Sequence, residues 1–195
     1  MGIQIHAGEM VWYAAGQFYV DEHGRAFDVG FFTNIKGIEG PFFKDATPLE
    51  PASAYFTFSA IDDPFTGIAG KIGKIPIMEY PKGDWKLFLK VEPGASFDDP
   101  ASFSNNAEHI ATFRREVAAV SASIHVLSAS LLSFRLTWSK PFTFHDQSYD
   151  LKNLIPYGVT QIGDGEKTPL PPIPHYPNVS AFLGSAFAIG GPVVN

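Results

Sequence analysis

The chain has 195 residues, of which 45% are apolar and 17% charged, a composition that gives one globular domain a sizeable core and is too apolar for a disordered segment. Its formal charge of −6 argues against a nucleic-acid partner, because phosphates select clustered Lys and Arg side chains. The lack of cysteine excludes disulfides and thiolate metal sites.

The sequence favours a soluble, cytoplasmic protein that does not insert into a membrane. Its first residues lack the basic and apolar regions of a signal peptide. No apolar run reaches the ~20 residues that a membrane-spanning helix needs. The longest one, Val117 to Leu132, is interrupted by serines and by His125.

The N-terminal part predicts a β-hairpin. Glu9 to Ala15 and Gln17 to Val20 are rich in aromatic and β-branched residues, which favour strands. Asp21 to Arg25 then has the composition of a tight turn, in which Gly24 supplies a positive φ. Ala26 to Thr33 is the predicted returning strand.

Phenylalanine is unusually abundant, with 18 residues, so we expect some rings to line a cavity or an interface. Neighbouring side chains of a strand point to opposite faces, so the consecutive pairs Phe31–Phe32 and Phe42–Phe43 place a ring on each face. Either both faces are covered or a partner covers one. Ala54 to Ile61 is a further predicted strand. The rings expected to contact a ligand are Phe31, Phe32, Phe42, Phe43, Phe56 and Phe58.

The middle of the chain predicts two strands and one short helix. Residues 67–75 contain three glycines and are expected to form a mobile flap or a plain connection. Ile75 to Tyr80 and Trp85 to Glu92 are predicted to pair as a hairpin around a turn at residues 81–84. A capping-box pattern and apolar residues at helical spacing predict a helix over residues 106–116.

A strict alternation from Ala118 to Trp138 predicts a third hairpin with a turn near residues 127–131. The expected register places Val126 opposite Leu132 and brings all apolar side chains to one face. On the other face, His125 and Arg135 become diagonal neighbours, roughly 5–8 Å apart at Cβ. That polar face either lines a barrel interior or is solvated.

The C-terminal part predicts short strands at Phe142–His145, Tyr149–Leu151 and Tyr157–Ile162. Residues 167–177 are too rich in proline for a central strand and predict an extended surface arm. An apolar strand over residues 179–189 is expected to complete the fold. The sequence thus predicts an all-β, mainly antiparallel fold: a single-domain β-barrel or β-sandwich over residues 1–195, with one short helix.

Sequence motifs of common enzymes are missing. Gly184–Ser185 lacks the flanking glycines of a nucleophile elbow, and Gly163–Gly165 is followed by Thr168 where a dinucleotide fingerprint needs glycine. The six histidines include no closely spaced pair. We therefore expect neither a metal nor a cofactor.

Our first hypothesis is a barrel that encloses a small, largely apolar ligand. It would act as a cofactor-independent isomerase, cyclase or lyase, with His125 as acid and base and Arg135 as stabiliser of negative charge. Tyr19 and Asp28 are further catalytic candidates, because they are polar residues on otherwise apolar strands. A carrier without catalysis would use the same cavity, so the sequence leaves enzymatic activity open.

The second hypothesis is a binding or assembly module without catalysis. Its exposed aromatic residues would cover a protein partner, including a second copy in a homodimer. Carbohydrate binding on exposed Trp12, Trp85 or tyrosine side chains is a third alternative.

Overall fold

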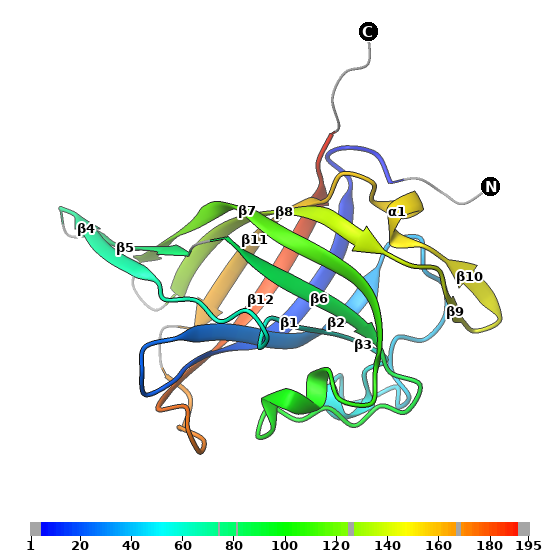
Figure 1. Cartoon of the computed structure of the whole chain (residues 1–195), viewed down its shortest axis with the longest axis horizontal. Helices are drawn as coiled ribbons and strands as arrows, with labels where there is room; N and C mark the ends of the chain where they lie inside the picture. The colour runs from blue at the N-terminus through cyan, green and yellow to red at the C-terminus, as the bar shows by residue number, and fades with distance from the viewer. Residues whose placement is uncertain (1–4, 74, 81, 125–126, 167–168, 191–195) are drawn as a thin grey trace, which may run out of the picture.

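The computed structural model describes residues 5–73, 75–80, 82–124, 127–166 and 169–190, which form mainly antiparallel strands (Figure 1). Eight strands build the central part of a ten-stranded sheet: β1 (Met10–Val20), β2 (Ala26–Ile35), β3 (Phe56–Ser59), β6 (Gly83–Leu89), β7 (Glu108–Ile124), β8 (Leu127–Ser139), β11 (Val159–Glu166) and β12 (Asn178–Ala188). The other elements are β4 (Ile68–Ile72), β5 (Ile75–Tyr80), β9 (Phe142–Phe144), β10 (Gln147–Tyr149), the helix α1 (Leu151–Leu154) and the 3-10 turns η1 (Pro51–Ser53) and η2 (Pro100–Phe103). Among the described residues, no helix is long and apolar enough to cross a membrane.

The central sheet closes on itself. Its strands pair in the order β7-β6-β3-β2-β1-β12-β11-β8, and β8 pairs again with β7, so the eight strands form a closed antiparallel barrel. Closure removes the open edges that a flat sheet would expose. The all-β prediction is confirmed, and the barrel rather than the sandwich is the architecture.

The interior of the barrel at one end is filled by aromatic side chains. Trp85 stacks on Phe58 with ring centroids 4.2 Å apart, and the Phe134 ring lies 4.8 Å from that of Trp85. Trp12 makes edge contacts with Phe32 and Phe113. Helix α1 packs against β8 at this end, where Ile5 donates a backbone hydrogen bond to the Leu154 carbonyl. These rings are fully buried and hold the strands together by apolar burial.

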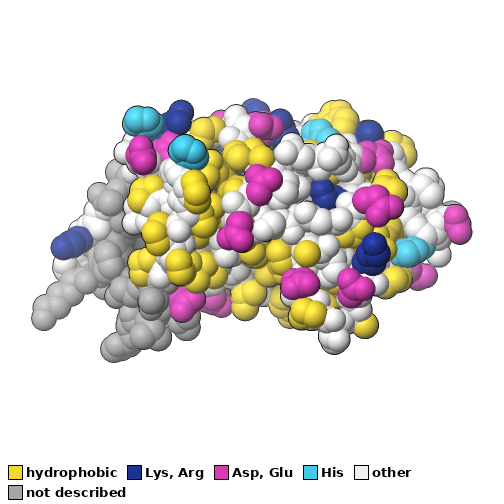
Figure 2. Space-filling model, turned by 90° about the horizontal axis from the view of Figure 1, so that it is seen from below, with side chains coloured by type: hydrophobic (Ala, Val, Ile, Leu, Met, Phe, Trp, Pro, Cys, Tyr) yellow, Lys and Arg dark blue, Asp and Glu magenta, His cyan; other side chains and the backbone are white. Residues whose placement is uncertain are grey.

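Loops of the chain itself cover part of the barrel's outside. Phe31 points outward from β2, where its ring meets those of Phe43 and Phe97. Phe32, the next residue, points into the barrel. Both faces of this strand are therefore covered within one chain. This was one of the two alternatives expected for the Phe pairs. Seen from below, hydrophobic side chains gather over the left part of the surface, with acidic side chains scattered across the face (Figure 2).

Several local predictions are confirmed. The opening hairpin forms from β1 and β2, and β9, β10, β11 and β12 match the predicted C-terminal strands within a few residues. Residues 169–177 contain no regular strand; single bridges join Leu170 to Val179 and, around a turn, Ile173 to Tyr176. The glycine-containing segment differs from the expected flap or plain connection, because residues 68–72 form strand β4, which pairs with β5.

The predicted helix over residues 106–116 is wrong, because this stretch belongs to strand β7. Ile110 and Phe113 are both fully buried. The pairing of β7 with β6 shifts its register at Ile110, between His109 and Ala111, and this irregularity breaks the simple alternation of a strand, so buried residues three apart imitate the spacing of a helix.

Two predicted hairpin pairings are also wrong. Strands β5 and β6 do not pair with each other; both pair with β7, which is long enough to hold them one after the other. In the β7–β8 hairpin, Ile124 pairs with Leu127, so residues 127–131 belong to β8 and not to the turn. His125 and Val126 lie outside the described residues.

Candidate functional site

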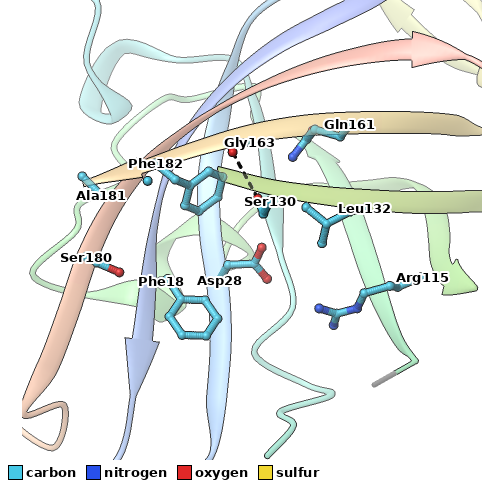
Figure 3. A pocket seen from close by; sticks show the side chains of 11 residues that line it. Phe18, Asp28, Arg115, Ser130, Leu132, Gln161, Gly163, Ser180, Ala181 and Phe182 are labelled. Carbon is cyan, nitrogen blue, oxygen red and sulfur yellow. Dashed lines mark hydrogen bonds between the residues drawn. The ribbon is translucent and has the colours of Figure 1, made fainter. Parts of the chain in front are cut away.

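The barrel contains a small cavity of about 90 Å³ at the end that carries the β1–β2 turn. Its apolar lining is formed by Phe18, Leu132 and Phe182, and its polar lining by Asp28, Arg115, Ser130, Gln161 and Ser180 (Figure 3). Phe18, Phe182 and Ser180 are half-buried, so the cavity is reached from this end of the barrel. Glycines of β11 leave room for it: Gly163 and Gly165 line the cavity without filling it.

Asp28 places a carboxyl group inside the barrel. Its neighbours on β1, β2 and β3 alternate in and out of the barrel, and Asp28 shares the inward face with Phe18, its cross-strand partner. Both carboxyl oxygens accept hydrogen bonds from Trp85 Nε1, at 2.9 and 3.0 Å. Burial raises the pKa of the Asp28 carboxyl, and the opposing effects of Arg115 and of the Trp85 N–H do not cancel this rise.

Arg115 places a guanidinium group on the opposite wall, on β7. It is 2% exposed, and its guanidinium carbon lies 4.4 Å from the centroid of the Phe65 ring, a cation–π contact. Gly83 leaves the space that the guanidinium needs, because a Cβ there would lie 2.8 Å from Nη2. The carboxyl of Asp28 and the guanidinium of Arg115 point toward one another in Figure 3.

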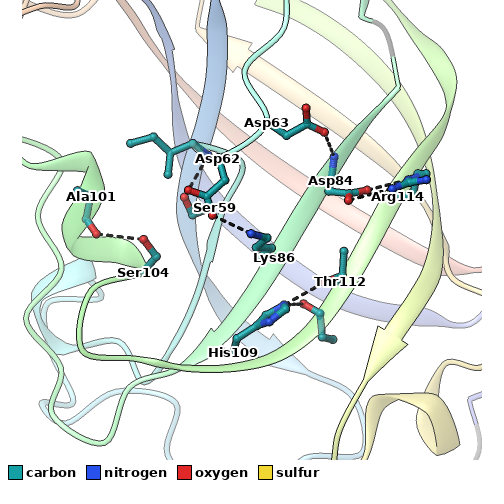
Figure 4. Close-up of polar contacts among 12 residues, drawn as sticks. Ser59, Asp62, Asp63, Asp84, Lys86, Ala101, Ser104, His109, Thr112 and Arg114 are labelled. Atoms are coloured by element: carbon teal, nitrogen blue, oxygen red, sulfur yellow. Dashed lines mark hydrogen bonds and ion pairs between the residues drawn. The ribbon is translucent and has the colours of Figure 1, made fainter.

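The two neighbouring arginines of β7 have opposite environments. Arg114 points outward and binds both carboxylate oxygens of Asp84, at 2.8 and 3.0 Å (Figure 4). This pair belongs to an outer wall of exposed polar contacts that also includes Lys86 with Asp62. Only Arg115 reaches the cavity, as the alternation of a strand requires.

Gln161 lines the deeper end of the cavity. It is 1% exposed and accepts a hydrogen bond from Trp12 Nε1 at 3.0 Å. Its side chain occupies the space beside Gly184, where a Cβ would lie 2.6 Å from the amide group. The cavity thus combines a carboxyl group, a guanidinium and an amide with apolar walls, the usual composition of a small-molecule site.

No family model, curated protein or solved structure matches this chain. The site therefore rests on its own geometry. Among the residues that the structure describes, no group of three or more His, Asp or Glu side chains is placed to hold a metal ion.

The structure places the predicted catalytic residues in different environments. The guanidinium of Arg135 lies outside the barrel, 61% exposed and 3.7 Å from Glu116, so its predicted place in a cavity is wrong. It lies outside because the apolar face of β8, with Phe134, turns inward. His125 lies outside the described residues. Asp28 is the predicted catalytic residue that the structure places at the cavity.

Tyr19 is buried but faces away from the cavity. It points outward from β1, stacks on Phe27, and donates hydrogen bonds to Gln17 and to the Phe97 carbonyl. Burial, with smaller contributions from Asp98 and Tyr176, raises the pKa of its hydroxyl. Its contacts make Tyr19 a structural residue of the covered outer side.

None of the six predicted ligand-contacting rings lines the barrel cavity. Phe32, Phe56 and Phe58 belong to the packed core, Phe42 and Phe43 pack in the loops beside it, and Phe31 borders an outer groove. The rings that line the cavity are Phe18 and Phe182. The sequence did not predict a role for Arg115, Gln161 or these two rings. The alternation of Ala111, Phe113 and Arg115 is nevertheless visible in the sequence.

Proposed function

We propose that the barrel binds a small, largely apolar molecule with an oxygen-bearing head and acts on it by acid–base chemistry, as an isomerase, cyclase or lyase. Support comes from one observation: a buried carboxyl group and a buried guanidinium line the same cavity, whose walls are partly apolar. Asp28 takes the role of acid and base, and Arg115 that of stabiliser of negative charge. They replace His125 and Arg135 of the sequence-based hypothesis.

The chemistry of the pair suits proton transfer next to a carbonyl group. A carboxyl whose pKa is raised by burial holds and returns a proton at a higher pH than an exposed one. A guanidinium in a site of low dielectric stabilises the enolate oxygen that forms when a proton leaves the adjacent carbon. The Trp85 N–H fixes the carboxyl in place.

The size of the cavity limits the ligand. Its volume of about 90 Å³ is small against the roughly 300–1,000 Å³ of drug-sized sites, so it accepts a head group of a few heavy atoms. The rest of the ligand would extend past Phe18 and Phe182 toward the end of the barrel. These half-buried rings would contact its apolar part.

The proposal is tested by hydrogen–deuterium exchange of small ketones such as cyclohexanone in D₂O, measured by NMR. Each event breaks one C–H bond next to the carbonyl and forms one C–D bond, with Asp28 carrying the proton or deuteron. We expect exchange above the buffer rate that Asp28→Asn abolishes. Asp146→Asn is the matched control, because Asp146 is exposed in the β9–β10 turn and its positive φ suits Asn.

A second variant separates binding from catalysis. Leu132→Trp fills the cavity and should abolish both ketone binding and exchange. Binding that Leu132→Trp blocks, without any exchange in the wild type, would support a carrier and contradict the enzymatic part. Exchange that is equal in all variants would contradict the site itself.

A further inference from the structure

A second and larger concavity lies on the outside of the barrel. It is an open groove of about 780 Å³, within the size range of small-molecule sites. Its floor is the outer face of β2, β1, β12 and β11, and one wall is formed by Leu49, Pro51 and Phe97. We call it the outer groove.

The floor changes from aromatic to acidic across the four strands. The pairing places Phe31, Ala15, Leu183 and Asp164 in one row, one residue from each strand. Glu166 shares the outward face of β11 with Asp164, two residues further on. Three spacings of ~4.8 Å between neighbouring strands separate the aromatic end from the acidic end by about 14 Å.

The groove exposes apolar and acidic groups together. Leu183 is 65% exposed and Leu49 is 57% exposed, which is unusual for leucines that face the same concavity. Among the lining residues that the structure describes are the carboxylates of Glu50, Asp164 and Glu166 but no lysine or arginine. None of these three carboxylates takes part in an ion pair within the described ranges.

We propose that the outer groove binds an elongated organic cation, an apolar chain or ring system that carries one ammonium group. The ammonium lies at Asp164 and Glu166, and the apolar body covers Leu183 and reaches the rings of Phe31 and Phe97. Both halves of such a ligand meet their complement, because apolar surface leaves water while the charge faces carboxylates at the rim. Along the part of the groove lining that the structure describes, an anion of the same shape would meet three like charges and no counter-charge.

The test compares decyltrimethylammonium with decanoate, which has a chain of similar length and the opposite charge. Calorimetric titration of the full chain, below the concentrations at which either probe forms micelles, should show the cation binding more tightly. The double variant Asp164→Asn/Glu166→Gln should weaken binding of the cation about tenfold and leave that of decanoate unchanged or tighter. Glu92→Gln/Asp146→Asn removes the same charge from exposed sites elsewhere and should change neither.

Two further variants locate the probe. Leu183→Ser should weaken binding of the cation, because it removes the exposed apolar centre of the groove. Leu132→Trp, which fills the barrel cavity, should leave it unchanged, so the result does not depend on the function proposed above. Equal affinity for both probes, or no loss in the double carboxylate variant, would overturn the proposal. Sedimentation that shows a dimer lost in Leu183→Ser would also overturn it, since a second copy would then occupy the groove.

Discussion

The two buried tryptophans of the barrel offer a matched test of the electrostatics at the cavity. Trp85 donates its ring N–H to the carboxyl of Asp28, whereas Trp12 donates its ring N–H to the neutral amide of Gln161. Both side chains are at most 1% exposed and both contact other rings. Replacing each by Phe removes the donor and part of the ring, so the loss of packing is similar in the two variants.

The magnitude follows from the charge of the acceptor. A hydrogen bond between neutral groups contributes about 0.5–1.5 kcal/mol to stability, and one to a charged group about 1.5–3 kcal/mol. Trp85→Phe should therefore cost about 1 kcal/mol more than Trp12→Phe when Asp28 is ionised. When Asp28 is protonated, the two costs should agree.

The sign of the pH dependence follows from the raised pKa of Asp28. Because the pKa is higher in the folded than in the unfolded chain, the Asp28 proton stabilises the fold fully below the ordinary value of 3.8, and this contribution is lost as the pH rises through the folded pKa. The Trp85 N–H lowers this pKa, so its removal raises the pKa further. Trp85→Phe should then lose more stability on raising the pH than the wild type does.

Urea unfolding followed by circular dichroism at about pH 4 and about pH 8 measures both free energies of unfolding. We expect the stability cost of Trp85→Phe to grow with pH while that of Trp12→Phe stays constant. A cost that is independent of pH for both variants would refute the place of an ionisable, hydrogen-bonded Asp28 inside the barrel.

Three further predictions concern the barrel wall and its covering. Gly16→Ala should lower the free energy of unfolding by at least about 2 kcal/mol in urea titrations. The new Cβ would lie 2.6 Å from the Val29 carbonyl oxygen and 2.7 Å from the Phe182 ring. Unchanged stability would contradict the close approach of β1 and β2. Phe31→Ser should cost about 3 kcal/mol without altering the solution mass, since this ring is covered by its own chain; loss of a dimer would instead favour the assembly hypothesis. Asp150→Ala should remove about 1 kcal/mol from the free energy of unfolding and so lower the melting temperature, because the Asp150 carboxylate caps α1. An unaltered melting temperature would show that the cap contributes nothing.

The opening hairpin could be predicted because its information is local. The turn at residues 21–25 is marked by Gly24, whose φ is +76°, and the flanking strands alternate up to their ends. The same holds for the strand β12, which is apolar and bounded by prolines. Barrel closure could not be predicted over a sandwich, since it depends on pairing between the first and last strands.

The register of the β7–β8 hairpin was missed because alternation alone does not fix it. Small polar and apolar residues alternate through both strands, so several turns satisfy the pattern. The register also shifts on either side of Arg115, between Thr112 and Phe113 and between Arg115 and Val117. Arg135 faces outward because the face of β8 that carries Phe134 turns inward, and Arg115 of β7 supplies the guanidinium of the cavity.

Asp28 could be predicted from the sequence as a candidate site residue, but its partners Trp85 and Arg115 could not. A carboxyl on an apolar strand is visible in the sequence, but its hydrogen bond with Trp85 and its electrostatic interaction with Arg115 join residues 57 or more positions apart. Those contacts exist only after the barrel closes. The site is therefore a product of long-range pairing.

The central claim, that the cavity beside Asp28 and Arg115 holds a small ligand, is tested most directly by nuclear Overhauser contacts between bound ¹³C-labelled cyclohexanone and the protein. We expect contacts with the methyl groups of Leu132 and the ring of Phe182. Contacts confined to Leu49 and Leu183 in the outer groove, or none at all, would contradict it.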